Sequence, residues 1–489
     1  MVNLQAKGFD ALATSDTVAL VCTQEQVASN AFIPEQLHDV FALIDIKTFK
    51  AKPNSYYYNA LKNKPAILLV GLGPQNNVSA ETLRNAASTI VQACQDKGLT
   101  QIHIVVPSLT AVPDGARCIA EGVFLSNYNF NRYKTNNDES APLLQKAILV
   151  CDNPQQLSPM LKEVAVVCSN TLLCRDLVNE TTENANPVTI AKLAKKIAAQ
   201  HAIQCTVYTK KDITKMKMGL LLAVSRGSIY PPYCIVMRYR GAPSKKESIA
   251  IVGKGITFDT GGINLKPTGH IETMRTDMAG AATCIYAIAA VAQMKLLMNV
   301  YVVIPLAENM ISHTAYKPGD VFTAYNGKTV EILSTDAEGR LILADALSFT
   351  EKTIKPKAII DLATLTGACI VSFGEIVAAY LTNDEQLSTA LIKASEATGE
   401  KIWRLPLYKE YSEEMKSDIA DIVNVPAQRN AGTIMGATFL KNFIEDTPWV
   451  HIDIAGTAWY SKKRGYVPKY ATGFGVRLLY RFVKDISGQ

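Results

Sequence analysis

Short runs of aliphatic and β-branched residues alternate with helix-period segments along almost the whole chain, and no other feature of the sequence constrains the fold as strongly. Strand-like runs at 17–22, 66–70 and 249–253 are each bounded by turn residues. The segment 79–97 is amphipathic, with Ser79 suited to cap its start and Gly98 to end it. Because strands that alternate with helices assemble into mostly parallel sheets covered by helices, the pattern predicts the α/β class.

The same reasoning predicts the remaining elements and the domain organisation. We predict further strands at 102–106, 147–150, 203–208, 234–238, 300–305, 329–333 and 358–362, and helices at 157–179, 188–200, 278–294, 341–352 and 436–445. A chain of 489 residues is long enough for two or three domains. The long helix and the polar stretch 180–187 after it predict a link between two domains: an N-terminal α/β domain of residues 1–165, which includes the start of the linker helix, and a C-terminal domain of residues 166–489.

Composition and charge argue against several classes of protein. Fifty Lys and Arg against forty-four Asp and Glu leave a net charge of +6, too mild an excess to predict a nucleic-acid or membrane partner. Ten cysteines without a CxxC pair, mostly inside apolar runs, predict buried thiols in a reducing compartment. Residues 1–14 lack the apolar core of a signal peptide, and Gln293, Lys295 and Asn299 interrupt the most apolar long window, 284–307. We therefore expect a soluble cytoplasmic protein.

Carboxylates concentrate where two of the predicted strands end. Asp259 follows the strand 249–253, Asp277 begins a helix rich in Ala and Gly, and Asp336 and Glu338 follow the strand 329–333. Because Asp336 and Glu338 are two residues apart in a segment that we expect to be extended, both side chains can leave the same face. The carboxyl ends of strands line the ligand crevice of an open α/β sheet, so these four acids are expected to converge from neighbouring strand ends.

Four converging carboxylates repel one another by several kcal/mol unless a cation lies between them. Divalent metal ions are the obvious cation, and two ions about 3.5 to 4 Å apart need bridging carboxylates of this kind. None of the six histidines lies in a metal-ligand pattern, and an oxygen-rich site leaves Mg, Mn and Zn open. Helix capping and surface ion pairs are the alternative. Taken alone, Asp277 fits that alternative, because it lies at a helix start. The other acids have glycine-rich, weakly charged surroundings, so capping and surface pairing explain the four acids together poorly.

The motif Ser-Thr-Asp-Ala-Glu-Gly-Arg-Leu at 334–341 resembles the signature of the leucyl aminopeptidases (cytosol aminopeptidases), a family of dinuclear metallopeptidases, with Ser334 where Asn is commoner. Four further blocks resemble the family, at 252–262, 274–282, 361–367 and 453–456, so that the resemblance covers about residues 170–489. It implies an N-terminal domain of macro-like α/β architecture and a catalytic domain with a mixed, mostly parallel sheet flanked by helices.

Residue by residue, the resemblance implies a ligand set for two metal ions. One tightly bound ion is held by Lys254, Asp259, Asp277 and Glu338. A second, more exchangeable ion is held by Asp259, Asp336 and Glu338, with help from the backbone carbonyl of Asp336. The implied metals are Mn²⁺ or Zn²⁺, with Mg²⁺ possible in the exchangeable site. A lysine amine can bind metal only when neutral, so Lys254 would have to lose its proton.

The resemblance also assigns two catalytic residues, Lys266 and Arg340. A metal-bridging water is then the nucleophile, and the Lys266 ammonium stabilises the oxyanion that develops on the substrate carbonyl. Arg340 holds a bicarbonate that carries the proton from the water to the leaving amine. The alternative for both residues is charge balance without catalysis.

For substrates, the resemblance implies peptides whose free α-amino group binds one metal, which makes the enzyme an exopeptidase. The pocket for the first side chain is implied at Met274, Thr364, Leu365, Gly367 and Ala455, a mostly apolar lining suited to leucine- and methionine-like residues. Met274 and Ala455 could equally be ordinary core. The segment 424–436 keeps little of the glycine-rich sequence that is usual in the family.

Two other functions remain to be weighed, together with the assembly. A different two-metal hydrolase, such as a phosphatase, would be expected to use histidine ligands and several phosphate-binding cations, and the site segments supply only Lys266, Arg275 and Arg340. Some members of the family also bind DNA as regulators, but the basic groups at 195–196, 210–211 and 462–464 are scattered and typical of solvated faces. The family assembles as homohexamers, dimers of trimers, and the resemblance implies the same assembly here.

Overall fold

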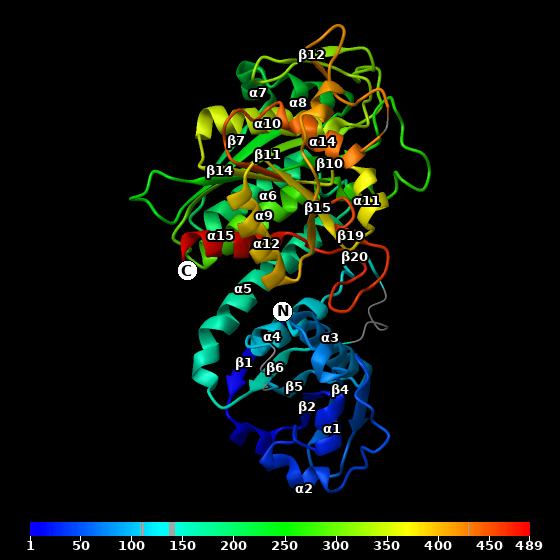
Figure 1. The fold of residues 1–489 in the computed structure, drawn as a ribbon, viewed down its shortest axis with the longest axis vertical. Coiled ribbons are helices and arrows are strands. Elements are labelled where there is room, and N and C mark those ends of the chain that lie inside the picture. Colours follow the sequence, from blue (N-terminus) through cyan, green and yellow to red (C-terminus); the bar gives the residue numbers. More distant parts are fainter. Residues whose placement is uncertain (108, 110–111, 136–141, 429) are drawn as a thin grey trace. The chain divides into compact units, whose positions relative to one another are not determined.

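The structure is a computed structural model that describes residues 1–107, 109, 112–135, 142–428 and 430–489. The chain divides into two compact units (Figure 1). The first comprises Met1–Leu172 and Lys462–Lys469, and the second comprises Leu173–Ser461 and Tyr470–Gln489. The predicted domain boundary, between residues 165 and 166, differs from this division in one substantial respect. The prediction assigned residues 462–469 to the second domain, whereas they belong to the first unit. Tyr466 of that segment is buried in the core of the first unit, a contact between distant parts of the chain that spacing along the sequence does not show.

The first unit is built on a six-stranded sheet in the order β1-β6-β5-β2-β4-β3. All neighbours are parallel except the edge pair β3 and β4. The strands are β1 Asn3–Lys7, β2 Thr17–Cys22, β3 Tyr56–Asn59, β4 Ala66–Gly71, β5 Gln101–Val105 and β6 Lys146–Val150. The strands predicted in this unit are confirmed, whereas β1 and β3 were missed because both are short edge strands with polar residues and tyrosines.

Successive strand residues of the first unit alternate between two buried clusters. Ala19 and Val21 of β2 pack in one cluster, with residues of α3, α4 and α5, while Val18 and Leu20 pack in the other. The helices of this unit are α1 Gln24–Ser29, α2 His38–Phe41, α3 Ala80–Asp96, α4 Gly115–Ser126 and the first part of α5 Pro154–Asn179. The predicted cap of α3 is confirmed, since the Ser79 side chain accepts a hydrogen bond from the backbone N–H of Thr82 at 3.2 Å.

Helix α5 is long and apolar enough to cross a membrane by its length and composition, and half of its most apolar window is buried. Leu161, Val164, Cys168 and Leu172, at helical spacing, lie in the first of the two buried clusters just described. The apolar face of α5 that these residues form therefore packs into the core of the first unit. All ten cysteines are free thiols, eight of them buried, as the sequence predicted.

The second unit is built on a nine-stranded mixed sheet in the order β16-β15-β18-β14-β9-β11-β8-β7, with β10 also paired with β11. Most neighbours are parallel, and β7–β8, β8–β11 and β15–β18 are antiparallel. The strands are β7 Gln204–Tyr208, β8 Tyr233–Arg240, β9 Ile249–Gly253, β10 Gly255–Asp259, β11 Asn299–Asn309, β14 Ala358–Ala363, β15 Ala378–Thr382, β16 Ile402–Arg404 and β18 Trp449–Asp453. The predicted α/β class and mixed, mostly parallel sheet are confirmed.

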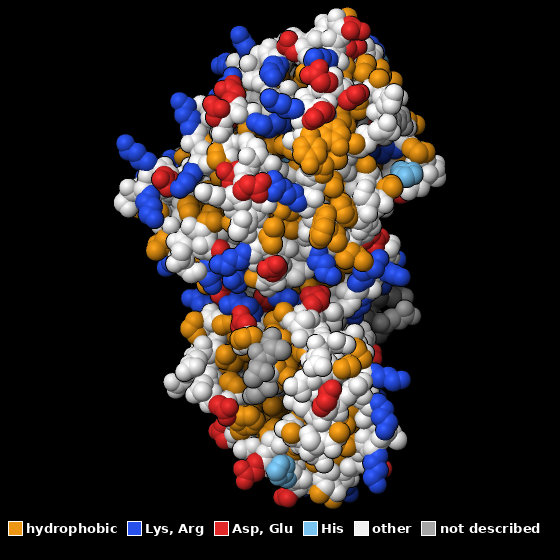
Figure 2. Space-filling view, in the orientation of Figure 1, with side chains coloured by type: hydrophobic (Ala, Val, Ile, Leu, Met, Phe, Trp, Pro, Cys, Tyr) orange, Lys and Arg blue, Asp and Glu red, His pale blue; other side chains and the backbone are white. Residues whose placement is uncertain are grey.

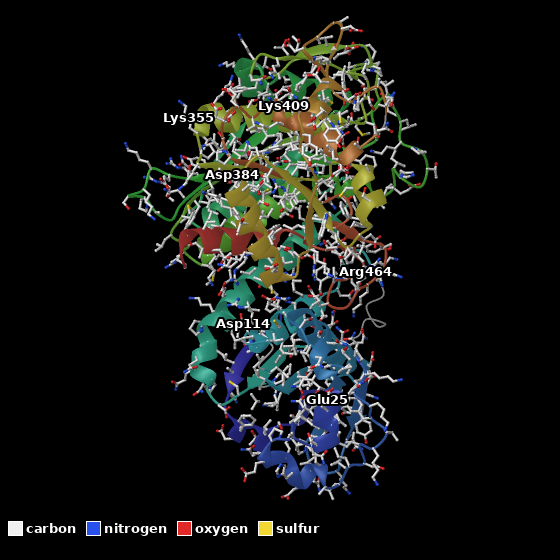
Figure 3. The ribbon with its side chains drawn as sticks, in the orientation of Figure 1. Glu25, Asp114, Lys355, Asp384, Lys409 and Arg464 are labelled. Carbon is white, nitrogen blue, oxygen red and sulfur yellow. The ribbon has the colours of Figure 1, made fainter. Side chains whose placement is uncertain are left out.

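Helices cover both faces of this sheet (Figure 1). Helix α9 packs against β9 and β14 on one face, where α12 and α15 pack with it, and α8, α10 and α14 share the large core cluster on the other. The helices are α6 Pro187–Gln200, α7 Lys210–Met216, α8 Gly219–Val224, α9 Ala279–Gln293, α10 Glu338–Phe349, α11 Gly367–Phe373, α12 Glu385–Thr398, α13 Glu410–Glu413, α14 Gly432–Lys441 and α15 Val476–Ser487. Asp384, labelled in Figure 3, caps α12 by accepting from the backbone N–H of Leu387 at 2.8 Å.

One predicted strand lies outside the large sheet. The strand expected at 329–333 is β13 Thr329–Glu331, which pairs with β12 Val321–Thr323 and β17 Ile422–Val423 in a small separate sheet. The prediction that Asp259 and Asp336 follow neighbouring strands of one sheet was therefore wrong. The partner of β13 along its parallel edge is some ninety residues away in the chain, and periodicity cannot detect such a pairing. A two-stranded ladder of β19 Trp459–Tyr460 and β20 Tyr470–Ala471 completes the strands.

Candidate metal centre

Lys254 occupies the single-residue break between β9 and β10, two strands that both run parallel to β11. The side chain is buried, and its Nζ donates to Asp277 Oδ1 at 2.7 Å, to Glu338 Oε1 at 2.9 Å and to the carbonyl oxygen of Thr364 at 2.8 Å. The lysine thus joins three segments that are far apart in the sequence. Asp277 receives a further bond, from the Thr364 hydroxyl at 2.7 Å.

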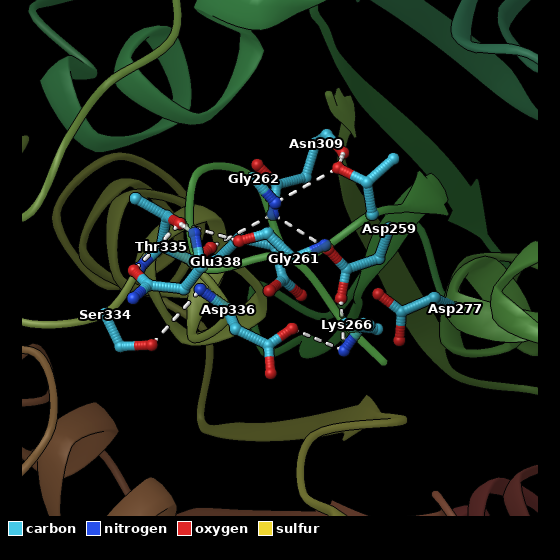
Figure 4. Close-up of polar contacts among 12 residues, drawn as sticks. Asp259, Gly261, Gly262, Lys266, Asp277, Asn309, Ser334, Thr335, Asp336 and Glu338 are labelled. Carbon is cyan, nitrogen blue, oxygen red and sulfur yellow. Dashed lines mark hydrogen bonds and ion pairs between the residues drawn. The ribbon is translucent and has the colours of Figure 1, made fainter. Parts of the chain in front are cut away.

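Asp259 is the last residue of β10, a strand that was not predicted from the sequence (Figure 4). Its Oδ1 accepts from the backbone N–H of Gly261 and from Asn309 Nδ2, both at 2.8 Å. Its other oxygen, Oδ2, is 2.9 Å from Lys266 Nζ, which also lies 2.5 Å from Asp336 Oδ1. Lys266 therefore bridges two carboxylates that come from different segments of the unit.

Asp336 and Glu338 do not lie in an extended segment, as the sequence predicted. Asp336 belongs to a turn and Glu338 is the first residue of α10. Three of the four acids nevertheless converge as expected, because one carboxylate oxygen from each of Asp259, Asp336 and Glu338 lies within 4.8 Å of the other two. Asp277 is linked to Glu338 through the Lys254 ammonium. The turn and the start of α10 bring the side chains of Asp336 and Glu338 together. We had expected alternation along an extended strand to do so.

Burial and mutual repulsion shape the electrostatics of the cluster. Burial and the neighbouring Glu338 carboxylate raise the pKa of Asp259 to about 7, and burial is also the main cause that raises the pKa of Asp277 and Asp336. Burial opposes ionisation of Glu338 too, but the Lys254 and Lys266 ammonium groups outweigh it and lower the pKa of Glu338 to about 2. Two lysines are thus too few to keep all four acids in their ordinary ionised state.

The two lysines experience the opposite effect. Burial works against their charge, but the surrounding carboxylates outweigh it and raise the pKa of both Lys254 and Lys266. Two further oxygens, Asp277 Oδ2 and Glu338 Oε2, are buried and have no hydrogen-bond partner among the described residues. A buried oxygen without a donor is costly unless a cation or water meets it. The chemistry of these acids therefore fits divalent cations, and the residues that could hold them are Lys254, Asp259, Asp277, Asp336 and Glu338.

Arg340 lies in the first turn of α10, close to the cluster and buried. Its Nη1 donates to the carbonyl oxygen of Asn424 at 2.9 Å, and its Nε has no partner among the described residues. Burial lowers the pKa of the guanidinium to about 10, against the opposing effect of Glu338, so that it stays charged near neutral pH. A buried, charged guanidinium with an unused donor is suited to hold an anion.

A cavity of about 750 Å³ opens over this cluster, with Lys266, Asp336 and Arg340 in its wall. The rest of its lining is mostly apolar and includes Leu265, Leu333, Leu365, Ala368, Val425, Pro426, Ala427 and Met435. Of the residues that the sequence suggested for a substrate pocket, Leu365 and Gly367 line the cavity. Met274, Thr364 and Ala455 are not among its described lining residues.

Sequence reasoning missed two kinds of residue that shape the cluster. Gly339 lies beside Lys254, and a Cβ added to it would be 2.5 Å from Lys254 Nζ and 2.8 Å from Cδ. Asn309, at the end of β11, holds Asp259 and is fully buried. A polar residue at the end of a buried strand was the available signal for Asn309. Gly339 lies within the motif at 334–341, but only the structure shows that it packs against Lys254.

Comparison with known proteins matches both parts of the chain to one family. Residues 172–480 match the description "Cytosol aminopeptidase family, catalytic domain", and residues 20–137 match "Cytosol aminopeptidase family, N-terminal domain". The chain belongs to the cytosol aminopeptidase family. The resemblance inferred from the motifs is thereby confirmed, and this member of the family is an aminopeptidase, an enzyme that removes amino acids from the N-termini of peptides.

Relatives of this cytosol aminopeptidase family member are similar over nearly their whole length. A "Probable cytosol aminopeptidase" of Protochlamydia amoebophila is 42% identical over 92% of this chain and 91% of that protein. The protein of the same name from Geobacter sp. (strain M21) is 44% identical over 86% of this chain and 85% of its own. The solved structure of the bottromycin maturation enzyme BotP matches with a TM-score of 0.86 and 31% identity, covering 97% of this chain and 100% of that one; another describes BotP in complex with Mn.

The DNA-binding alternative receives no support from these relatives, whose names mention no nucleic acid. On the face shown in Figure 2, Lys and Arg are interspersed with Asp and Glu over the second unit. The three basic pairs lie in α6, in α7 and in the segment 462–469 of the first unit. The basic pairs therefore come from three separate elements of the chain, one of them in the first unit.

Proposed function

We propose that this aminopeptidase is metal-dependent and holds two divalent cations through Asp259, Asp277, Asp336 and Glu338. Lys254 would join these ligands by giving up its proton when a cation replaces its ammonium beside Asp277 and Glu338. The observation that carries the proposal is the pair of buried oxygens, Asp277 Oδ2 and Glu338 Oε2, that have no donor among the described residues in a cluster already rich in acids. Mn²⁺ is our first candidate because a solved structure of a relative is described with Mn. The ions would supply Lewis-acid activation of the scissile carbonyl and of water at neutral pH.

Lys266 is suited to stabilise negative charge on the substrate. Its ammonium faces the cavity, with 16% of the side chain exposed, and the carboxylates of Asp259 and Asp336 hold it in place. A fixed cation in a partly dehydrated site stabilises an oxyanion without reorganising during the reaction. We therefore assign Lys266 the role of binding the carbonyl oxygen as its negative charge develops.

Arg340 is suited to hold an anion that takes up and returns a proton, and bicarbonate is our candidate. The support is a charged guanidinium in the cavity wall whose Nε has no partner in the part of the chain that the structure describes. The carbonyl of Asn424 fixes one terminal nitrogen, which leaves the remaining donors to grip a planar oxyanion.

The apolar part of the cavity supports a preference for leucine- and methionine-like N-terminal residues of peptides. Leu365, Val425 and Met435 present aliphatic or thioether surface in the wall, away from the charged cluster. A substrate side chain that has no charge and no hydrogen-bonding group leaves no polar group unpaired when it is buried against this apolar wall.

Hydrolysis of leucine p-nitroanilide tests the proposed function. We expect turnover to disappear after exhaustive chelation and to return when Mn²⁺ is added back, because the acids cannot form the site without a cation. Asp336→Ala should not recover under the same conditions. Turnover that survives chelation, or full activity in Asp336→Ala, would contradict metal dependence.

Gly339→Ala provides a test of the placement of Lys254. The added methyl would collide with the buried lysine stem, so we expect the affinity for Mn²⁺ to fall by at least about tenfold and stability to fall by roughly 1 to 3 kcal/mol. Calorimetric titration with Mn²⁺ and thermal unfolding would measure the two effects. Gly115→Ala is the matched control, since Gly115 also lies in the first turn of a helix, and its added Cβ would meet Leu83 Cδ1 at an ordinary 3.4 Å. Equal affinities in both variants would contradict the proposed role of Lys254.

We further propose a cytoplasmic homohexamer, a dimer of trimers. Exposed apolar side chains of the second unit support an assembly, among them Val371 at 89% and Trp403 at 65% exposure, and Figure 2 shows hydrophobic side chains open to solvent there. Sedimentation of a stable 53.2 kDa monomer would contradict it.

A further inference from the structure

The turn that carries Asp336 has no strand partner, yet its backbone groups are bound by side chains. Asn424 Oδ1 accepts from the backbone N–H of Leu333 at 2.8 Å, and its Nδ2 donates to the carbonyl of Ser334 at 2.6 Å. The backbone N–H of Thr335 donates to Asn264 Oδ1 at 2.8 Å. Side chains of three asparagines, Asn264, Asn424 and Asn309, thus satisfy backbone hydrogen-bonding groups of this turn. In an extended segment a neighbouring strand would satisfy them.

Asn309 is the asparagine that also contacts a proposed metal ligand (Figure 4). Its Nδ2 donates to Asp259 Oδ1 at 2.8 Å and to the carbonyl oxygen of Thr335 at 3.0 Å. The residue ends β11 and stands directly opposite Asp259 of β10 in the ladder. One amide group therefore links the end of β10 to the turn before Asp336.

The geometry restricts how these two ligand-bearing segments can move. Asp259 Oδ1 is occupied by Asn309 and the Gly261 backbone, which leaves Oδ2 as the oxygen that faces Lys266. The Thr335 carbonyl also accepts from the hydroxyl of Tyr316 at 2.7 Å, and both Asn309 and Tyr316 are almost completely buried. Water cannot easily replace either donor, so loss of one leaves the Thr335 carbonyl with a single donor, and loss of Asn309 also leaves Asp259 Oδ1 with the Gly261 N–H alone.

We propose that Asn309, assisted by Tyr316, is a positioning residue that sets the spacing between Asp259 and Asp336 and so determines the affinity of the site for divalent cations. The inference rests on the proposed function. Hydrogen-bond partners that orient metal ligands commonly change affinity or activity by roughly 10- to 100-fold when removed.

The test is calorimetric titration of Mn²⁺ into the metal-stripped full-length protein, combined with thermal unfolding in the absence of metal. We expect Asn309→Ala to bind Mn²⁺ roughly 10- to 100-fold more weakly than the wild type. Tyr316→Phe keeps the ring and removes one donor, so its affinity should fall by about 2- to 10-fold.

Asn299→Ala is the matched control. Asn299 is the first residue of the same strand and is buried, and its Nδ2 donates to the carbonyls of Ala242, Lys245 and Glu247. It lies roughly 30 Å from Asn309 along the strand. We expect it to lower the melting temperature about as much as Asn309→Ala and to leave Mn²⁺ affinity at the wild-type value.

The outcomes separate the inference from the proposed function. If the wild type binds no Mn²⁺, the proposed function fails. If the wild type binds and Asn309→Ala binds equally well, or Asn299→Ala weakens binding as much, the positioning role is overturned and Asn309 is merely structural. Should Asn309→Ala fail to fold, unchanged affinity in Tyr316→Phe overturns the role, and weakened affinity supports it.

Discussion

Replacing Glu338 with glutamine is expected to lower kcat/KM for leucine p-nitroanilide by about three orders of magnitude and to abolish tight Mn²⁺ binding. Glutamine keeps the shape of the side chain but removes a charge from the carboxylate that approaches both Asp259 and Asp336, and that also pairs with Lys254 at 2.9 Å. A bound metal ion stabilises charge in the transition state by several kcal/mol, and each 1.36 kcal/mol is a factor of ten in rate. Steady-state kinetics at saturating Mn²⁺, together with calorimetry, would measure the loss.

Glu400→Gln is the matched control for that experiment. Glu400 is a buried carboxylate of the same unit, and it accepts from the backbone N–H groups of Gly475 and Leu478 at 3.1 and 2.7 Å. Its substitution should lower stability without changing Mn²⁺ affinity. Wild-type turnover in Glu338→Gln, or an equal loss of Mn²⁺ affinity in both variants, would remove Glu338 from the proposed site.

Lys266→Met is expected to lower kcat by roughly 10²- to 10³-fold, the cost of removing one preorganised group that stabilises an oxyanion. The same substitution should leave Mn²⁺ affinity unchanged or raise it, because it removes a positive charge from between Asp259 and Asp336. KM should change little if the interaction forms mainly in the transition state. Lower turnover with unchanged or higher Mn²⁺ affinity identifies Lys266 as a catalytic cation, whereas loss of a metal ligand would lower both.

Lys317→Met is the control for the loss of a lysine charge, since Lys317 is 62% exposed and forms an ion pair with Asp320 at 3.4 Å. Its kinetics and metal affinity should match those of the wild type. If Lys266→Met loses Mn²⁺ affinity along with turnover, Lys266 holds the carboxylates in place and the assigned role in stabilising the oxyanion is wrong.

Elements with a strong local signal could be predicted well. Helix α3 has an amphipathic period and a serine cap, and β2 and β4 are short aliphatic runs between turns, so the sequence places them to within a residue or so. By contrast, β10 was not predicted, because the sequence indicated a strand at 249–253 and placed Asp259 only after its end. Only its pairing with β11 makes it a strand.

The sequence by itself determined the family, the α/β class and the identity of the acids and lysines, because these depend on residue types in short motifs. The tertiary structure alone decided how the residues meet. It placed Asp336 in a turn and Glu338 at a helix start, assigned β13 to a separate sheet, and put Asn309 beside Asp259. The physical reason is that hydrogen bonds and charge interactions at these positions join segments separated by tens of residues. Such contacts depend on packing of the whole unit, which local periodicity does not encode.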